Sequence, residues 1–301
     1  MNITIASPRS KKTICEVTVD PSSTVADLKK KFAQQKKVGV ERQRFSFEHP
    51  TKGMVVLSND KETLSNYGVT TNTTVLFKDL GMQISWTLVF LAEYAGPLFV
   101  YPIFYFFSRQ IYGFETPKTF VQDVALICYS LHYIKRILET IFVHRFSKAT
   151  MPITNLFKNC IYYWGCTSMV SYFVNHPLYT PPAALNQYIG FGLWAFGEIM
   201  NLVCHIQLRN LRPAGSNVRK IPRGLLFEFV SCPNYTVEIL AWLGFSIMTQ
   251  TLTSYLFTLL GAGQMYIWAC GKHRNYKKEF TGKDGSPLYP KNRKIIIPFL
   301  L

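Results

Sequence analysis

Residues 84–107, ISWTLVFLAEYAGPLFVYPIFYFF, decide the fold class of this chain. The stretch is 24 residues long with one charge, Glu93, and a helix of that length can cross a bilayer core of roughly 30 Å. Further apolar stretches lie at 119–143, 156–175, 187–208, 226–246 and 249–270. The sequence therefore predicts that residues 81–301 form a multi-pass α-helical membrane domain with about six or seven transmembrane helices.

The distribution of charge supports six spans. The 301 residues include 33 Lys and Arg against 17 Asp and Glu, a net charge of +16, although charged residues make up only 17% of the chain. If the N-terminus is cytosolic, the cytosolic connections hold two basic residues after the second stretch, five after the fourth and eight after the sixth, whereas the opposite side holds only Arg109 and Lys118. This positive-inside pattern predicts cytosolic N- and C-termini. Because the basic clusters alternate with spans, a nucleic-acid partner is not expected.

Residues 1–80 have the composition of a small α+β domain. Segments 2–5 and 13–19 alternate apolar and polar residues, as a strand hairpin does. Ser22, Ser23 and Thr24 offer N-caps for a helix over 25–35, and further strands are expected at 44–47 and 74–77 around a short turn at 63–67. This order predicts a ubiquitin-like (β-grasp) cytosolic domain.

Several motif-like patterns are better explained by structure than by ligand binding. Residues 190–195 match GxGxxA, but they lie inside an apolar stretch with no strand before them, so helix packing through small residues is expected. Three N-glycosylation sequons begin at Asn2, Asn72 and Asn234, all on sides predicted to be cytosolic or buried. The seven cysteines form no CxxC pair and the six histidines form no HExxH motif, so no metal site is expected.

Ionisable residues at membrane depth are costly and are therefore candidates for function. His132, Lys135 and Glu139 lie on one stripe of the second apolar stretch. Two interpretations stay open for Lys135: a catalytic amine, or an internal salt bridge with Glu139 at the cytosolic end. For Arg136, snorkelling of the guanidinium to the membrane surface is the favoured interpretation.

The fifth apolar stretch opens with SCPNYTVE, in which Asn234 and Glu238 are one helical turn apart. An amide and a carboxylate so placed suit the carboxamide of a nicotinamide, whereas the structural alternative is helix capping. Tyr235 and Trp242 beside them favour a binding site. Phosphate-compatible charge is supplied by the loop LRNLRPAG at 208–215 and by KHRNY at 272–276.

Several long segments resemble one known family. LHYIKRILETIFVHRFS at 131–147, MPITNLFKNCIYYW at 151–164, SCPNYTVEILAW at 231–242 and the closing IIIPFLL, together with LRNLRPAGS, RKIP and the junction KDLGMQISW, closely resemble the very-long-chain trans-2-enoyl-CoA reductases. These form a branch of the steroid 5-alpha-reductase family. The resemblance covers nearly the whole chain, including the N-terminal domain.

The resemblance implies an endoplasmic reticulum membrane enzyme that uses NADPH to reduce the trans-2 double bond of very-long-chain enoyl-CoA, the last step of each fatty-acid elongation round. It implies partners among the other elongation enzymes, namely elongase, ketoacyl-CoA reductase and hydroxyacyl-CoA dehydratase. It also implies roles for individual residues. The catalytic pair is Lys135 and Tyr235, and the NADPH site comprises Asn201, Arg212, Asn234, Glu238, Trp242 and Tyr276.

Steroid-reducing members hold the substrate carbonyl through residues that correspond to Glu93 and Tyr133. The chain departs from that branch in two places: the loop at 208–215 is one residue shorter, and His205 replaces an aspartate. In the expected mechanism, Tyr235 supplies a proton or a hydrogen bond. Lys135 either lowers the effective pKa of the Tyr235 phenol or stabilises the enolate. The alternatives are a reductase of a steroid or polyprenoid enone, and a non-catalytic membrane scaffold.

Overall fold

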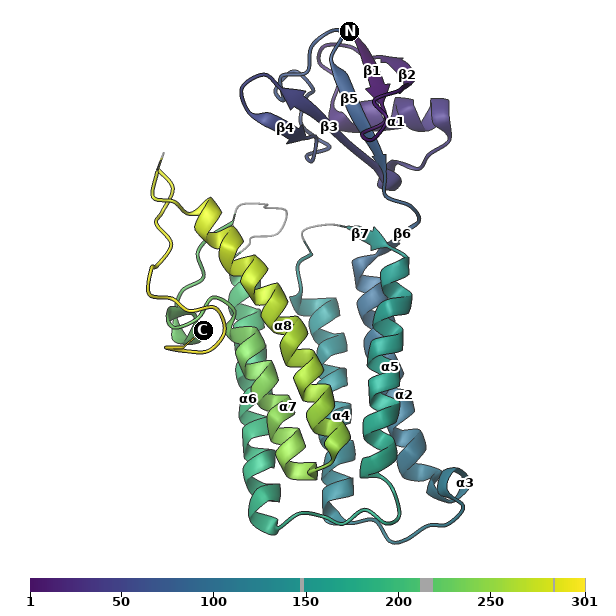
Figure 1. The fold of residues 1–301 in the computed structure, drawn as a ribbon, viewed down its shortest axis with the longest axis vertical. Coiled ribbons are helices and arrows are strands. Elements are labelled where there is room, and N and C mark those ends of the chain that lie inside the picture. The colour runs from purple at the N-terminus through teal and green to yellow at the C-terminus, as the bar shows by residue number, and fades with distance from the viewer. Residues whose placement is uncertain (147–148, 212–218, 284, 301) are drawn as a thin grey trace. The chain divides into compact units, whose positions relative to one another are not determined.

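The computed structural model describes residues 1–146, 149–211, 219–283 and 285–300, and it divides into two compact units (Figure 1). The first comprises Met1–Ser85 and Ala149–Asn155, and the second comprises Trp86–Lys148 and Leu156–Leu301.

The first unit is built on a five-stranded sheet in the order β2-β1-β5-β3-β4. Its strands are β1 (Asn2–Ala6), β2 (Thr13–Thr18), β3 (Gln43–His49), β4 (Gly53–Val56) and β5 (Thr74–Asp79). The β1–β2 hairpin is antiparallel as expected, and β1 pairs in parallel with β5. The sequence did not indicate β4, nor the small pair of β6 (Gln83–Ser85) with β7 (Thr150–Pro152).

One helix, α1 (Val25–Lys36), packs its buried Val25, Leu28 and Phe32 against the sheet. Its N-terminus is fixed by a capping box, because the Thr24 hydroxyl accepts a hydrogen bond from the Asp27 amide while the Asp27 carboxylate accepts one from the Thr24 amide. The Thr24 hydroxyl also donates to the Asp27 carboxylate, and the two hydrogen bonds that this carboxylate accepts from Thr24 lower the pKa of Asp27. This topology and core confirm the predicted β-grasp domain.

The second unit is mainly helical, with non-helical connections and a non-helical C-terminal segment after Glu279. Long helices run side by side in Figure 1, with the short α3 (Ser108–Tyr112) near one end. The long helices are α2 (Trp86–Phe106), α4 (Phe120–Leu138), α5 (Thr154–Val174), α6 (Ala184–Asn210), α7 (Pro233–Thr249) and α8 (Leu252–Glu279). The last turn of α4 continues as a π-helical segment, η2 (Glu139–Val143), a feature often found at functional sites.

Six long helices match the six apolar stretches, with two differences in their bounds. The fifth helix begins at Pro233 rather than near residue 226, because residues 225–228 form the separate 3-10 turn η3 (Leu225–Glu228) and proline suits a first helical turn. The sixth helix continues to Glu279, so Tyr276 and the basic residues before it lie on α8 itself and not beyond it. Two of the helices, α2 and α6, are long and apolar enough to cross a membrane.

The helical unit has an aromatic core that includes buried charged residues, and it exposes many apolar side chains. Its core combines aromatic side chains, among them Tyr129, Tyr133, Trp242 and Phe245, with buried charged residues. Large apolar side chains point outward from the same helices: Leu88, Phe99 and Phe106 on α2, Ile127 and Leu131 on α4, Phe196 and Ile199 on α6, and Leu259 and Ile267 on α8.

Candidate active site

A chain of polar contacts connects α4 and α6 inside the helical unit. The Lys135 ammonium on α4 lies 2.7 Å from Glu198 Oε2 on α6 and donates to Asn201 Oδ1 at 2.8 Å. The other oxygen of Glu198, Oε1, lies 2.6 Å from His132 Nδ1. His132, Glu198 and Asn201 are buried, whereas Lys135 is half-buried. The amine singled out from the sequence is therefore held across two helices.

Asn201 extends this chain to α7. Its amide nitrogen donates to the Asn234 carbonyl at 2.9 Å and to Glu238 Oε2 at 3.2 Å. Three residues that the sequence assigned to the cofactor site, Asn201, Asn234 and Glu238, thus lie together, one hydrogen bond away from Lys135. We call the set His132, Glu198, Lys135, Asn201 and Glu238 the polar chain.

A second charged group lies next to the polar chain. The Arg136 guanidinium donates to Glu139 Oε2 at 2.9 Å and to the Tyr94 hydroxyl at 3.0 Å. Arg136 is buried and does not snorkel, because Glu139 and Tyr94 provide partners inside the bundle. Glu139 lies 3.9 Å from Lys135, farther than Glu198, so the expected Lys135–Glu139 pair exists but is not the closest contact of the amine.

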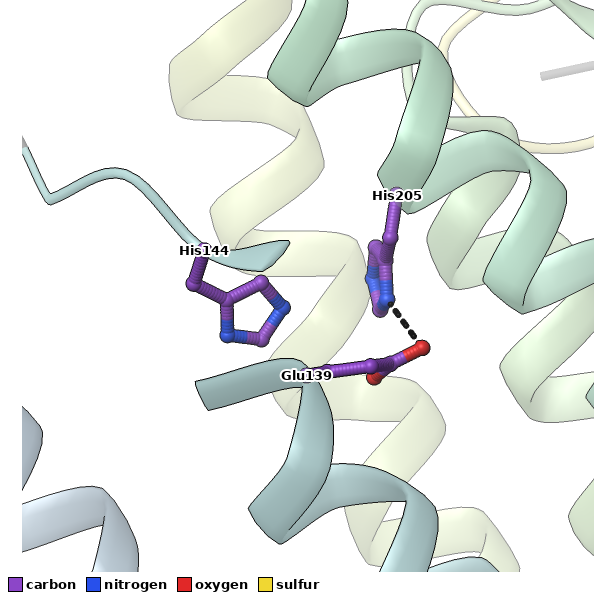
Figure 2. Close-up of side chains that lie close together, drawn as sticks. All are labelled: Glu139, His144 and His205. Atoms are coloured by element: carbon purple, nitrogen blue, oxygen red, sulfur yellow. Dashed lines mark ion pairs between the residues drawn. The ribbon is translucent and has the colours of Figure 1, made fainter. Parts of the chain in front are cut away.

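Glu139, His144 and His205 bring three potential metal ligands together (Figure 2). Their ligand atoms lie within 4.8 Å of one another, and His205 Nδ1 is 3.0 Å from Glu139 Oε1. Burial and the charge of Arg136 lower the pKa of His144 to about 3, so its imidazole is neutral at pH 7. A divalent cation here would compete with the Arg136 guanidinium on Glu139 and would be repelled by Lys135. These charges favour an ion-pair network over a metal site.

Glu93 and Tyr133 are fully buried, on α2 and α4. Asn159 on α5 donates to Glu93 Oε2 at 2.6 Å, but Glu93 Oε1 and the Tyr133 hydroxyl have no hydrogen-bond partner within the described part of the chain. Buried polar atoms without partners are rare and are often completed by a ligand.

The indole of Trp242 packs 4.5 Å from the His132 ring, between centroids, and contacts Tyr133. Trp242 therefore packs in the core against His132 of the polar chain.

Tyr235 lies on a different face of α7. Successive residues of a helix differ by about 100°, and the Tyr235 ring turns towards α8, where it contacts Trp268. The Lys272 ammonium lies 4.6 Å from the centroid of the Tyr235 ring. Lys135 and Tyr235 make no contact with each other among the described residues. The cation placed beside the phenol is therefore Lys272.

The outer part of the expected cofactor site is only partly described. The Tyr276 ring stacks on Tyr289, with centroids 5.4 Å apart and planes 6° from parallel. Arg212 lies outside the described residues.

The polar atoms around Asn234 and Glu238 fit a nicotinamide carboxamide. The side-chain amide of Asn234 makes no hydrogen bond among the described residues, and Glu238 is half-buried with only Oε2 engaged. Since a carboxamide has both donor and acceptor atoms, an amide and a carboxylate oxygen one turn apart can satisfy both.

Sequence reasoning missed Glu198. A signal was present: Trp194, Glu198, Asn201 and His205 recur at helical spacing and are all buried on α6. The polar members of this stripe face Lys135 and Arg136 on α4.

Comparison with known proteins identifies the class to which this fold and site belong. Residues 149–301 match the family model described as 3-oxo-5-alpha-steroid 4-dehydrogenase, and residues 3–77 match the ubiquitin family. The protein is thus an oxidoreductase with an N-terminal ubiquitin domain.

Relatives of full length define the branch. A very-long-chain enoyl-CoA reductase of Dictyostelium discoideum is 62% identical over 100% of both chains. A probable very-long-chain enoyl-CoA reductase of Caenorhabditis elegans is 49% identical over 94% of this chain and 93% of its own. A trans-2,3-enoyl-CoA reductase-like protein of Mus musculus is 38% identical over 99% of this chain and 84% of its own. The chain belongs to the very-long-chain enoyl-CoA reductases, as the resemblance implied.

Proposed function

We propose that this protein reduces the trans-2 double bond of very-long-chain enoyl-CoA with NADPH and so completes a round of fatty-acid elongation. The observation that carries the proposal is the polar chain, in which an ammonium at Lys135 is connected through Asn201 to Glu238. A cation beside a nicotinamide-compatible pair is what reduction of a conjugated thioester requires. The names of the relatives support the enoyl-CoA substrate.

Lys135 stabilises the negative charge that develops on the thioester oxygen. Its ammonium forms an ion pair with Glu198 Oε2 and donates hydrogen bonds to Asn201 Oδ1 and, at 3.4 Å, to the Glu198 carbonyl. The last contact is the longest and is the one that a thioester oxygen can replace. Tyr235 supplies a proton to the α-carbon, whereas Glu93 and Tyr133 offer buried polar atoms to the same end of the substrate.

Asn234 and Glu238 hold the nicotinamide carboxamide, and Asn201 keeps Glu238 in place. The reduced nicotinamide, when bound, supplies the hydride for the β-carbon. Trp242 closes the inner wall, and Arg212 and Tyr276 contact the phosphate and adenosine end. Because Glu238 orients the ring, Glu238→Ala should lower kcat even at saturating NADPH, whereas Arg212→Ala should mainly raise the KM for NADPH.

We further propose that the helical unit spans the endoplasmic reticulum membrane several times, with both termini cytosolic. The outward apolar side chains of α2, α4, α6 and α8 support this, since a surface of that kind is stable against lipid. The elongase, the ketoacyl-CoA reductase and the hydroxyacyl-CoA dehydratase are proposed partners because they would catalyse the three successive steps that lead to the enoyl-CoA substrate.

One assay separates this proposal from a steroid or polyprenoid reductase. Purified protein is given NADPH or NADH with trans-2-hexadecenoyl-CoA, with a steroid 4-en-3-one, or with a polyprenoid enone, and products are identified by mass spectrometry. We expect saturated hexadecanoyl-CoA with NADPH and little product from the two enones. Conversion of an enone alone would replace the proposed substrate, and no conversion by folded protein would favour a scaffold.

The proposed proton donor is tested in the same assay. Loss of one such group typically costs about 100- to 1,000-fold in rate, so Tyr235→Phe should lower turnover by that order. Near-normal turnover of Tyr235→Phe at equal protein amount would remove Tyr235 from the mechanism.

A further inference from the structure

We infer that Glu198 is a positioning residue that fixes the ammonium of Lys135 for the reaction, with His132 fixing the Glu198 carboxylate in turn. The inference rests on the catalytic role proposed for Lys135. Glu198 touches neither substrate nor cofactor in this account and acts through the amine.

The geometry around Lys135 leaves its head group little freedom. The Glu198 carboxylate pairs with the ammonium through Oε2 at 2.7 Å, and Asn201 Oδ1 accepts a hydrogen bond from it at 2.8 Å, whereas the Glu198 carbonyl at 3.4 Å occupies the position that the thioester oxygen takes. Ordering a long lysine side chain costs considerable rotamer entropy, and these contacts offset that cost. The Glu198 carboxylate and the Asn201 amide oxygen, one turn apart on α6, therefore hold the ammonium in place while the substrate is bound.

The carboxylate is itself held from the other side. His132 Nδ1 lies 2.6 Å from Glu198 Oε1, and because a carboxylate only accepts hydrogen bonds, this ring nitrogen carries the proton. The His132 ring is fixed by Trp242, 4.5 Å away between centroids. His132 and Lys135, one turn apart on α4, thus each contact one oxygen of the Glu198 carboxylate on α6.

The charges that remain around Lys135 indicate that the negative charge of Glu198 can be removed without leaving an excess of buried cations. Lys135 and Arg136 would then still face Glu139 and Glu238, two cations and two anions. Glu139 does not replace Glu198, since it is 3.9 Å from the amine and is occupied by Arg136 and His205. Glu198→Gln should therefore fold while losing the strongest contact of Lys135.

A double-mutant cycle tests the inference. Initial rates of enoyl-CoA reduction are measured for wild type, Glu198→Gln, Lys135→Met and the double variant, with Asp123→Asn as a control that removes a carboxylate from the opposite end of α4. We expect Glu198→Gln to lose about 100-fold in kcat, the typical cost of misplacing a reacting group by about an ångström. The double variant should be no slower than Lys135→Met, and Asp123→Asn should resemble wild type.

Each result has one meaning. If the losses of Glu198→Gln and Lys135→Met multiply, or if Glu198→Gln keeps normal kcat, Glu198 does not act through the amine and the inference is wrong. If Lys135→Met keeps normal activity, the proposed role of Lys135 fails first. If Glu198→Gln does not fold, His132→Phe, which keeps the ring against Trp242 but frees the carboxylate, must show a smaller loss that also vanishes in the Lys135→Met background.

Discussion

At the scale of single residues, the clearest departure from the family picture is the neighbour of Tyr235. The resemblance pairs Tyr235 with Lys135. In the structure, however, Lys135 pairs with Glu198, and the ammonium of Lys272 lies 4.6 Å from the centroid of the Tyr235 ring. The sequence placed Lys272 among phosphate contacts. A cation over the ring can instead stabilise negative charge on the phenol oxygen as its proton leaves.

We therefore expect Lys272→Gln to lower kcat roughly five-fold, in keeping with about 1 kcal/mol for an exposed cation–π pair. Lys272→Arg should keep most of the activity, and Arg274→Gln, on the same helix, serves as the matched control. Steady-state kinetics with varied NADPH separate the two roles. A rise in the KM for NADPH at unchanged kcat, suppressed by added salt, would show that Lys272 contacts phosphate instead.

At the scale of helices, α6 and α7 approach so closely that glycine is required between them. A Cβ on Gly190 would lie 2.4 Å from the Met248 amide nitrogen, whereas a Cβ on Gly192, two residues later, would meet no atom within 4 Å. Gly190 of the GxGxxA pattern is therefore used for helix packing, as expected, whereas Gly192 is not, and the α6–α7 packing brings Asn201 to Asn234 and Glu238.

This close approach gives a prediction with an internal control. Gly190→Ala should destabilise the protein by about 1–3 kcal/mol because the backbones must separate, and activity should fall with it. Gly192→Ala should be neutral or slightly stabilising. Thermal unfolding in detergent compares the two. Equal melting temperatures for both variants would mean that the α6–α7 contact is looser than described.

The sequence predicted the helices much better than their pairings. Periodicity and apolar length located the six long helices and the β-grasp elements other than β4, because those signals are local. The partner of Lys135 depends on how α6 is rotated against α4, which local patterns do not encode, so Glu198 was missed. Likewise Asn234 and Tyr235 are adjacent in sequence but face different helices.

In the molecule as a whole, the helical unit buries several charged residues beside its aromatic core and exposes many large apolar side chains, which is unusual for a water-soluble bundle. With the charge asymmetry of the connections, this supports a membrane domain whose basic connections and N-terminal domain share the cytosolic side. Asn72 is a natural reporter, because it is exposed in a glycosylation sequon of the N-terminal domain.

We expect full-length protein in microsomes to carry no glycan at Asn72, whereas a sequon introduced into the connection at 176–183 should be modified. Mobility before and after endoglycosidase treatment reports both sites. Glycosylation of Asn72 would place the N-terminal domain in the lumen and would reverse the proposed topology.

The most direct test of the central claim is turnover of trans-2-hexadecenoyl-CoA by wild type and Lys135→Met, purified in parallel and matched for amount and melting temperature. We expect wild type to form one saturated acyl-CoA per NADPH consumed, and Lys135→Met to lose about 100- to 1,000-fold in rate. A Lys135→Met protein that reduces the substrate at the wild-type rate would show that the polar chain is not the active site.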